Sequence, residues 1–140
     1  MKVLLIAPAS GNWHQVGQKR FFGGKTFRFS LLSLLTLAAE TPPDVDVRIV
    51  DEQVQDIPWG EHFDLVGITC MTAAAPRAYA IADRFRACGV QVVLGGMHPT
   101  FLPDEALEHA DAVCVGEAEE VWRHILEDAG HGKLSGTYSA

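Results

Sequence analysis

The sequence has little positive charge and no long apolar run. Its 140 residues contain 11 lysines and arginines against 18 aspartates and glutamates, which gives a formal net charge of −7. Nucleic acids and anionic membranes bind basic surfaces, so this balance argues against both as partners. The longest apolar stretch, residues 31–39, is interrupted by Ser33 and Thr36 and is too short to cross a bilayer.

Cysteines are few and widely spaced. Cys70, Cys88 and Cys114 form no CxxC or zinc-ligand pattern, and the first six residues are too short for a secretory signal. We therefore expect a cytoplasmic protein. Cys70 and Cys114 lie within predicted strands, where such thiols usually fill the core.

Phosphate-binding motifs are also missing. Residues 8–13 read PASGNW where a dinucleotide fold has GxGxxG, and no P-loop occurs. Residues 69–72 read TCMT, without the aspartate of a phosphoacceptor domain, and no Ser-His-Asp or Cys-His arrangement is visible from spacing. A nucleotide or flavin binder on the same fold stays as an alternative.

What the sequence does contain is a repeated alternation of strand and helix patterns. Short segments rich in Val, Ile and Leu, often apolar at consecutive positions, are typical of parallel strands covered on both faces. They are residues 2–7, 45–50, 65–70, 91–94 and 112–115.

Helical patterns separate most of these strands. One begins near Ser30 and places Leu31, Leu34, Leu35 and Ala38 on one face. Others follow at residues 74–85, from residue 103 and at residues 117–126, and Gly89 occupies the position of a left-handed C-cap. The pattern predicts an α/β domain with a doubly wound five-stranded parallel sheet, in the flavodoxin-like order 2-1-3-4-5, with helices on both faces.

Two segments fall outside this minimal fold. The connection over residues 8–29 is long and rich in glycine, which favours a functional loop. Residues 130–140 are predicted to be a linker, so the domain would span residues 1–129 and a C-terminal catalytic domain would follow. Asp51 and Glu52, at the end of the second strand, are interpreted as solvated acids.

The most informative segment is residues 92–100, VVLGGMHPT, in which an apolar strand ends in two glycines. Parallel sheets bind ligands at the carboxyl edge of their strands, and glycines allow a close approach there. A plain tight turn is the alternative interpretation of Gly95 and Gly96.

Four segments in this order resemble a known family. They are residues 2–8, residues 33–42 with 47–52, residues 92–100 and residues 110–119. Together they are similar to the amino-terminal cobalamin-binding, Rossmann-like domain of many radical S-adenosylmethionine enzymes. The resemblance implies a corrin over the carboxyl edge of the sheet, with its nucleotide tail in a crevice between strands.

The resemblance also implies a set of cofactor-binding residues on the loops at this edge. For Thr69 and Thr72, hydrogen bonding to the local backbone is the alternative role, and for His98 it is a structural role within its loop. The full set is Asn12, Trp13, His14, Gly17, Thr69, Thr72, Gly95, Gly96, His98, Gly116 and Glu117.

His14 is the candidate cobalt ligand. Residues 12–17 read NWHQVG, which matches the DxHxxG motif of classical cobalamin domains except that Asn12 replaces the aspartate. An asparagine carbonyl accepts the same hydrogen bond from the imidazole but carries no charge. A role in the loop or rim is the alternative for His14, and Trp13 is a candidate apolar surface beneath the corrin.

The CxxxCxxC motif that holds the [4Fe-4S] cluster of radical S-adenosylmethionine enzymes is absent from this chain. We assign no catalytic residue, and the chain alone is not expected to be catalytic. The expected function is to present cobalamin to the enzyme's own C-terminal domain, which would hold the cluster and S-adenosylmethionine and carry out methyl transfer or rearrangement. A protein-interaction domain of the same fold that has lost the cofactor is the main alternative.

Overall fold

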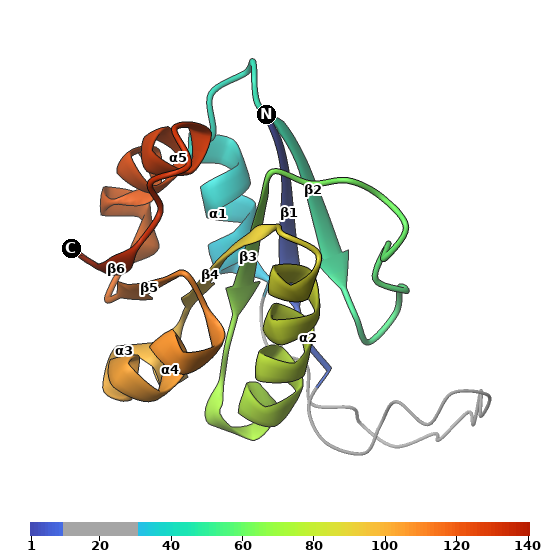
Figure 1. Cartoon of the computed structure of the whole chain (residues 1–140), viewed down its shortest axis with the longest axis vertical. Helices are drawn as coiled ribbons and strands as arrows, with labels where there is room; N and C mark the ends of the chain where they lie inside the picture. The colour runs from blue at the N-terminus through green and yellow to red at the C-terminus, as the bar shows by residue number, and fades with distance from the viewer. Residues whose placement is uncertain (10–30) are drawn as a thin grey trace.

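The computed structural model describes residues 1–9 and 31–140, and a parallel β-sheet lies at its centre (Figure 1). The sheet has six strands in the order β2-β1-β3-β4-β5-β6, and each neighbouring pair is parallel. The strands are β1 (Lys2–Ala7), β2 (Asp46–Asp51), β3 (Leu65–Thr69), β4 (Gln91–Gly95), β5 (Ala112–Val115) and β6 (Gly136–Ser139).

Helices cover both faces of the sheet (Figure 1). None of the helices in the described part of the chain has the combined length and apolarity that a bilayer crossing requires. They are α1 (Leu32–Glu40), α2 (Ala75–Ala87), α3 (Met97–Phe101), α4 (Pro103–His109) and α5 (Trp122–Gly130), with 3-10 turns η2 (Thr72–Ala74) and η3 (Ala118–Glu120).

The order of the first five strands confirms the predicted topology, but the predicted number of strands is wrong. Residues 136–139, which were expected within a linker, form β6 and pair with β5. Of its four residues only Tyr138 is buried, and the Tyr138 hydroxyl donates to Asp128 Oδ2 at 2.6 Å. An edge strand with one buried side chain has almost no apolar pattern, which is why the sequence did not reveal it.

Strand alternation divides the core into two halves. In β1, Leu4 and Ile6 pack on the side of α2 and α4, whereas Val3 and Leu5 pack on the side of α1 and α5. Both sets are fully buried, as expected for a parallel sheet covered on both faces. The two halves are called here the α2 face and the α1 face.

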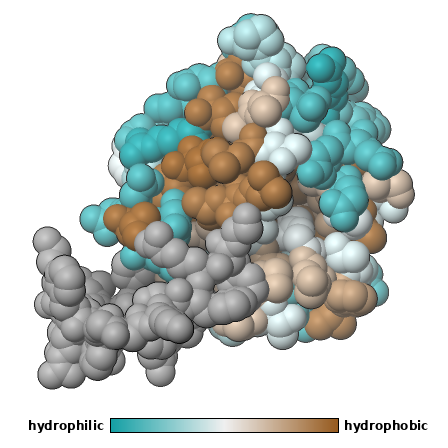
Figure 2. Space-filling view, turned by 180° about the vertical axis from the view of Figure 1, so that it is seen from behind, coloured by the Kyte–Doolittle hydropathy of each residue, from teal (hydrophilic) through white to brown (hydrophobic). Residues whose placement is uncertain are grey.

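Helix α1 buries a narrower stripe than the sequence predicted. Leu34 and Leu37 are buried, but Leu35 is 55% exposed and Leu32 is 66% exposed. The burial thus follows an i, i+3 pair, and the prediction for Leu35 is wrong. Seen from behind, the molecule shows a patch of hydrophobic side chains near the middle of this face (Figure 2).

A buried carboxylate holds the end of β1. Glu52 is 3% exposed, and its Oε2 accepts the backbone N–H of Ala9 at 2.9 Å. Both Glu52 oxygens also accept from Arg77 Nε, and a further short hydrogen bond joins Arg77 to Glu52. This pairing raises the pKa of the Arg77 guanidinium. The interpretation of Glu52 as a solvated acid is therefore wrong, because two partners compensate its burial.

Replacement of Arg77 by methionine should lower the free energy of unfolding by about 2 kcal/mol, because it removes a charged partner from a buried carboxylate. The matched control is Arg48→Met, which breaks the exposed Arg48–Glu61 pair and should cost less than about 1 kcal/mol. Urea unfolding of both variants measures the difference, and equal losses would contradict this role of Glu52.

Candidate functional site

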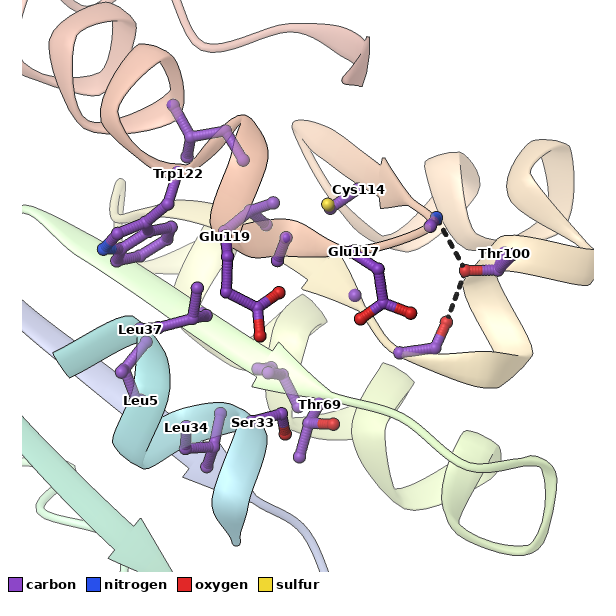
Figure 3. A pocket seen from close by; sticks show the side chains of 18 of the residues that line it. Leu5, Ser33, Leu34, Leu37, Thr69, Thr100, Cys114, Glu117, Glu119 and Trp122 are labelled. Atoms are coloured by element: carbon purple, nitrogen blue, oxygen red, sulfur yellow. Dashed lines mark hydrogen bonds between the residues drawn. The ribbon is translucent and has the colours of Figure 1, made fainter. Parts of the chain in front are cut away.

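A cavity of about 350 Å³ opens at the carboxyl edge of the sheet on the α1 face. It lies between the ends of β3, β4 and β5, the helices α1 and α5, and the turn η3 (Figure 3). We call it the edge cavity. Its lining includes Leu5, Ser33, Leu34, Leu37, Gly67, Thr69, Val93, Gly95, Gly96, Met97, Thr100, Phe101, Cys114, Gly116, Glu117, Glu119, Trp122 and Ile125.

Two strand glycines line this space. Gly67 in β3 and Gly95 in β4 line the cavity where other strand residues would project a side chain toward α1. Among the residues that the structure describes, a Cβ at Gly95 would meet only Cys114 Cβ, at 3.6 Å, so these residues leave the space above it open. A Cβ at Gly67 would lie 2.9 Å from Leu5 Cδ2. Gly67 was not assigned to the site from the sequence, although a glycine inside a strand is a known sign that a ligand or another backbone segment approaches the strand closely.

The part of the cavity farthest from the edge is apolar. We define this inner end by Leu5, Leu37, Val93, Trp122 and Ile125, all of which are buried. The only side-chain N–H among them, Trp122 Nε1, already donates to Thr41 Oγ1 at 2.8 Å. The inner end therefore offers apolar surface and no free side-chain donor.

The opposite end, called here the mouth, carries Ser33, Thr69, Glu117 and Glu119. Figure 3 shows these side chains on the side of the cavity nearer Thr100, and Leu5, Leu37 and Trp122 on the other side. Within the described residues, the structure gives no hydrogen-bond partner to the Ser33 or Thr69 hydroxyl. The mouth thus presents two available hydroxyls and two carboxylates.

The rim of the cavity is held by the loops after β3, β4 and β5. Thr100 Oγ1 donates to Gly96 O at 2.8 Å and accepts from Gly116 N at 3.1 Å (Figure 3). Cys70 N donates to Gly95 O at 2.8 Å. These bonds fix the spacing of the three loops, and Thr100 was not assigned to the site from sequence.

Gly95 and Gly96 have different roles. Gly96 has a φ of +98°, and a Cβ there would lie 3.1 Å from both Cys70 N and Cys70 O. Gly96 is thus required by the turn itself, and Gly95 by the open space of the cavity. The tight-turn interpretation thus applies to Gly96, and close approach of a ligand at Gly95 stays a prediction.

The structure places Thr72 and His98 outside the lining of the edge cavity. His98 is 6% exposed on the α2 side, where Nδ1 lies 3.2 Å from Thr72 Oγ1. Its Nε2 lies 3.1 Å from both Tyr79 Oη and Glu105 Oε1. His98 therefore joins α3 to η2, α2 and α4. The geometry supports the structural alternative for His98, and the partner of the Thr72 hydroxyl is this side chain rather than the local backbone.

The five other predicted residues within the described chain line the cavity: Thr69, Gly95, Gly96, Gly116 and Glu117. Asn12, Trp13, His14 and Gly17 lie outside the described residues, so the proposed cobalt ligand stays a prediction. In residues 1–9 and 31–140, no group of three His, Cys, Asp or Glu side chains is placed to hold a metal ion.

The two buried cysteines, Cys70 and Cys114, are protonated thiols at neutral pH. Burial, with a contribution from Glu119 and Glu117, raises the pKa of Cys114 to about 11. Burial and Glu105 raise the pKa of Cys70 to about 12. Cys114 is therefore a small neutral part of the cavity wall.

A second hollow of about 350 Å³ adjoins the edge cavity, over the ends of β1 and β3. The two share Ser33, Thr69, Gly96 and Met97. The remainder of the second hollow is lined by Ala7, Pro8, Leu31, Asp51, Gln53, Met71 and Ala74. A ligand with a large part above the sheet edge and a smaller part inserted beside the sheet would match this pair of spaces.

Comparison with known proteins agrees with this geometry. The model of the B12 binding domain matches residues 21–126. The chain is 44% identical over 110 residues to a bacteriochlorophyllide d C-8(2)-methyltransferase and 38% identical over 141 residues to a bacteriochlorophyllide d C-12(1)-methyltransferase, both of Chlorobaculum tepidum. These matches cover 78% and 99% of this chain but only 24% and 29% of the relatives.

A solved structure shows the same fold. The N-terminal domain of a hypothetical protein of Thermotoga maritima aligns with a TM-score of 0.54 at 24% identity, over 86% of this chain and 98% of that one. The class defined by fold and site is thus an α/β domain with a cavity at the carboxyl edge of a parallel sheet. The chain belongs to the B12-binding domain family, which confirms the resemblance seen in the sequence.

Substitution of Gly96 by alanine should cost at least about 2 kcal/mol of stability, because its backbone conformation is essentially restricted to glycine and its Cβ would press on Cys70. The control Gly60→Ala, where a Cβ meets nothing within 4 Å, should change stability by less than about 1 kcal/mol. Thermal or urea unfolding measures both, and a neutral Gly96→Ala would contradict the assigned role.

Replacement of His98 by alanine should cost about 2 kcal/mol, because it removes the hydrogen bonds that join α3 to three other elements. His62 is an exposed histidine with a side chain that is 83% accessible, and His62→Ala should change stability by less than about 0.5 kcal/mol. If both variants unfold at the same urea concentration, His98 does not hold α3 in place.

Proposed function

We propose that this chain binds cobalamin and presents it to the catalytic part of a longer radical S-adenosylmethionine methyltransferase. The chain spans about a quarter to 30% of the length of the curated relatives it matches, which are described as methyltransferases. The [4Fe-4S] cluster and S-adenosylmethionine would be bound by a catalytic domain of the longer protein, made of residues outside this chain.

The observation that carries the proposal is the edge cavity with its two strand glycines. A nucleotide tail needs a narrow space beside the sheet, and Gly67 and Gly95 line such a space without side chains. Its volume of about 350 Å³ lies within the range of roughly 300–1,000 Å³ usual for small-molecule sites. The residues present therefore fit the nucleotide part of the cofactor.

Each part of the described site has a task in this proposal. The mouth would bind polar groups of the tail through Ser33 and Thr69, and the inner end would exclude water from its base. The adjoining hollow over β1 and β3 would face the corrin. The bound cofactor supplies methyl-transfer chemistry at cobalt, and this chain supplies its position.

Binding can be tested with purified protein and hydroxocobalamin, followed by desalting and a visible spectrum. We expect corrin absorbance to stay with the protein in about one equivalent. A colourless protein would favour the alternative of an interaction domain that has lost the cofactor.

Substitution of Gly95 by leucine should fill the edge cavity and weaken cobalamin binding at least about tenfold, without loss of the fold, because the added side chain has free space. Gly60→Leu adds the same side chain in an exposed turn and should bind like the wild type. Titration followed by corrin absorbance measures both affinities, with circular dichroism as the check on folding. Equal affinities would show that the tail does not use this cavity.

A further inference from the structure

We propose that Thr41 is a positioning residue for the edge cavity: its hydroxyl holds the Trp122 ring in the place that keeps the inner end open. The inference rests on the proposed function and adds to it a residue that shapes the ligand space from outside. Thr41 directly follows α1 and is not part of the cavity lining. It was not assigned to the site from sequence.

The Thr41 hydroxyl bridges two walls of the cavity. Its Oγ1 donates to Leu37 O on α1 at 2.6 Å and accepts from Trp122 Nε1, at the start of α5, at 2.8 Å. A hydroxyl has one hydrogen to donate and two lone pairs, so both bonds form at the same time. Figure 3 shows Leu37 and Trp122 on the side of the cavity away from Thr100. One oxygen atom thus fixes the indole relative to the backbone of α1.

Trp122 needs such a fixed point because it is large and borders the cavity. It is the largest fully buried side chain among the described residues. The buried residues that pack with it in this half of the core are hydrophobic, and their contacts have no preferred direction. On the cavity side, the described residues supply no atoms that would oppose a movement of the ring. A hydrogen bond has a preferred direction, so the bond to Thr41 sets the position of the indole.

Local bonding at the end of α1 does not account for this arrangement. Thr36 lies in the same helix and makes the same kind of local bond, from its Oγ1 to Leu32 O at 2.9 Å. An indole has one N–H, and that of Trp122 is donated to Thr41, which is 81 residues away in the sequence. The two threonines thus share the local bond and differ in the tertiary one, so Thr36 is a matched control.

The test compares cobalamin with cobinamide, which has no nucleotide, on the wild-type chain and on Thr41→Val. Valine keeps the shape of threonine and removes the hydroxyl. We expect the wild type to prefer cobalamin, and the ratio of the two affinities to fall at least about threefold in Thr41→Val, because a ring that must be ordered on binding costs affinity. Titration of the corrin absorbance gives the dissociation constants, and circular dichroism checks the fold.

Two further variants separate positioning from a merely structural role. Thr41→Ser keeps the hydroxyl and should keep the wild-type ratio. Thr36→Val removes the same kind of local bond from α1 and should also leave the ratio unchanged. A ratio in either variant as low as that of Thr41→Val would contradict the assignment.

A double-mutant cycle tests whether Thr41 acts through Trp122. Trp122→Phe removes the N–H, so adding Thr41→Val in this background should not change the ratio further. An equal effect of Thr41→Val in both backgrounds would contradict the assignment. If Thr41→Val alone does not fold, Thr41→Ala, which leaves room for a water molecule on the indole N–H, takes its place in every comparison.

The outcomes distinguish the inference from the proposed function. An unchanged ratio in the folded Thr41 variant would overturn the inference and leave cobalamin binding intact. Equal affinities of the wild type for cobalamin and cobinamide would overturn it as well, because the nucleotide would then make no use of the cavity. If the wild type binds neither corrinoid, the inference and the proposed function both fail.

Discussion

The whole site depends on one constraint, which is that the sheet lacks side chains at two places on the α1 face. Parallel sheets in α/β domains normally fill this layer with branched apolar side chains that pack against the covering helices. Here Gly95 leaves this layer open beside Cys114, and the Leu5 side chain packs over Gly67. The α2 face carries the compensating packing, with Leu4, Val66 and Leu94 fully buried.

This division explains how a stable domain can keep a cavity beside its own core. A void usually costs stability because the lining atoms lose contacts that no neighbour replaces. The α2 face contains no glycine in its strand positions and is further joined by polar bonds at Glu52 and His98. The stability of the fold is thus concentrated on one side of the sheet, and the other side keeps space for a ligand.

Much of the fold was predictable because strands buried on both faces leave continuous apolar runs. The first five strands differ from their predicted bounds by at most one residue, and Gly89 has the positive φ of +77° expected of a C-cap. Residues 136–139 were missed because an edge strand needs few apolar side chains. Leu35 and Glu52 were misjudged because their burial depends on tertiary partners, and for Glu52 the deciding partner, Arg77, is 25 residues away.

The position of the candidate site at the sheet edge was predictable, but the residues that form the inner end of the cavity were not. Gly95, Gly96, Thr69 and Glu117 could be assigned because strand ends converge at one edge of a parallel sheet. His98 could not be placed correctly, since a five-residue helix turns consecutive side chains to opposite faces of the sheet. Met97 lines the cavity and His98 packs behind it among Thr72, Tyr79 and Glu105. Helix α3 therefore connects the two faces of the sheet: His98 anchors it on the α2 face, and Met97 lines the edge cavity on the α1 face.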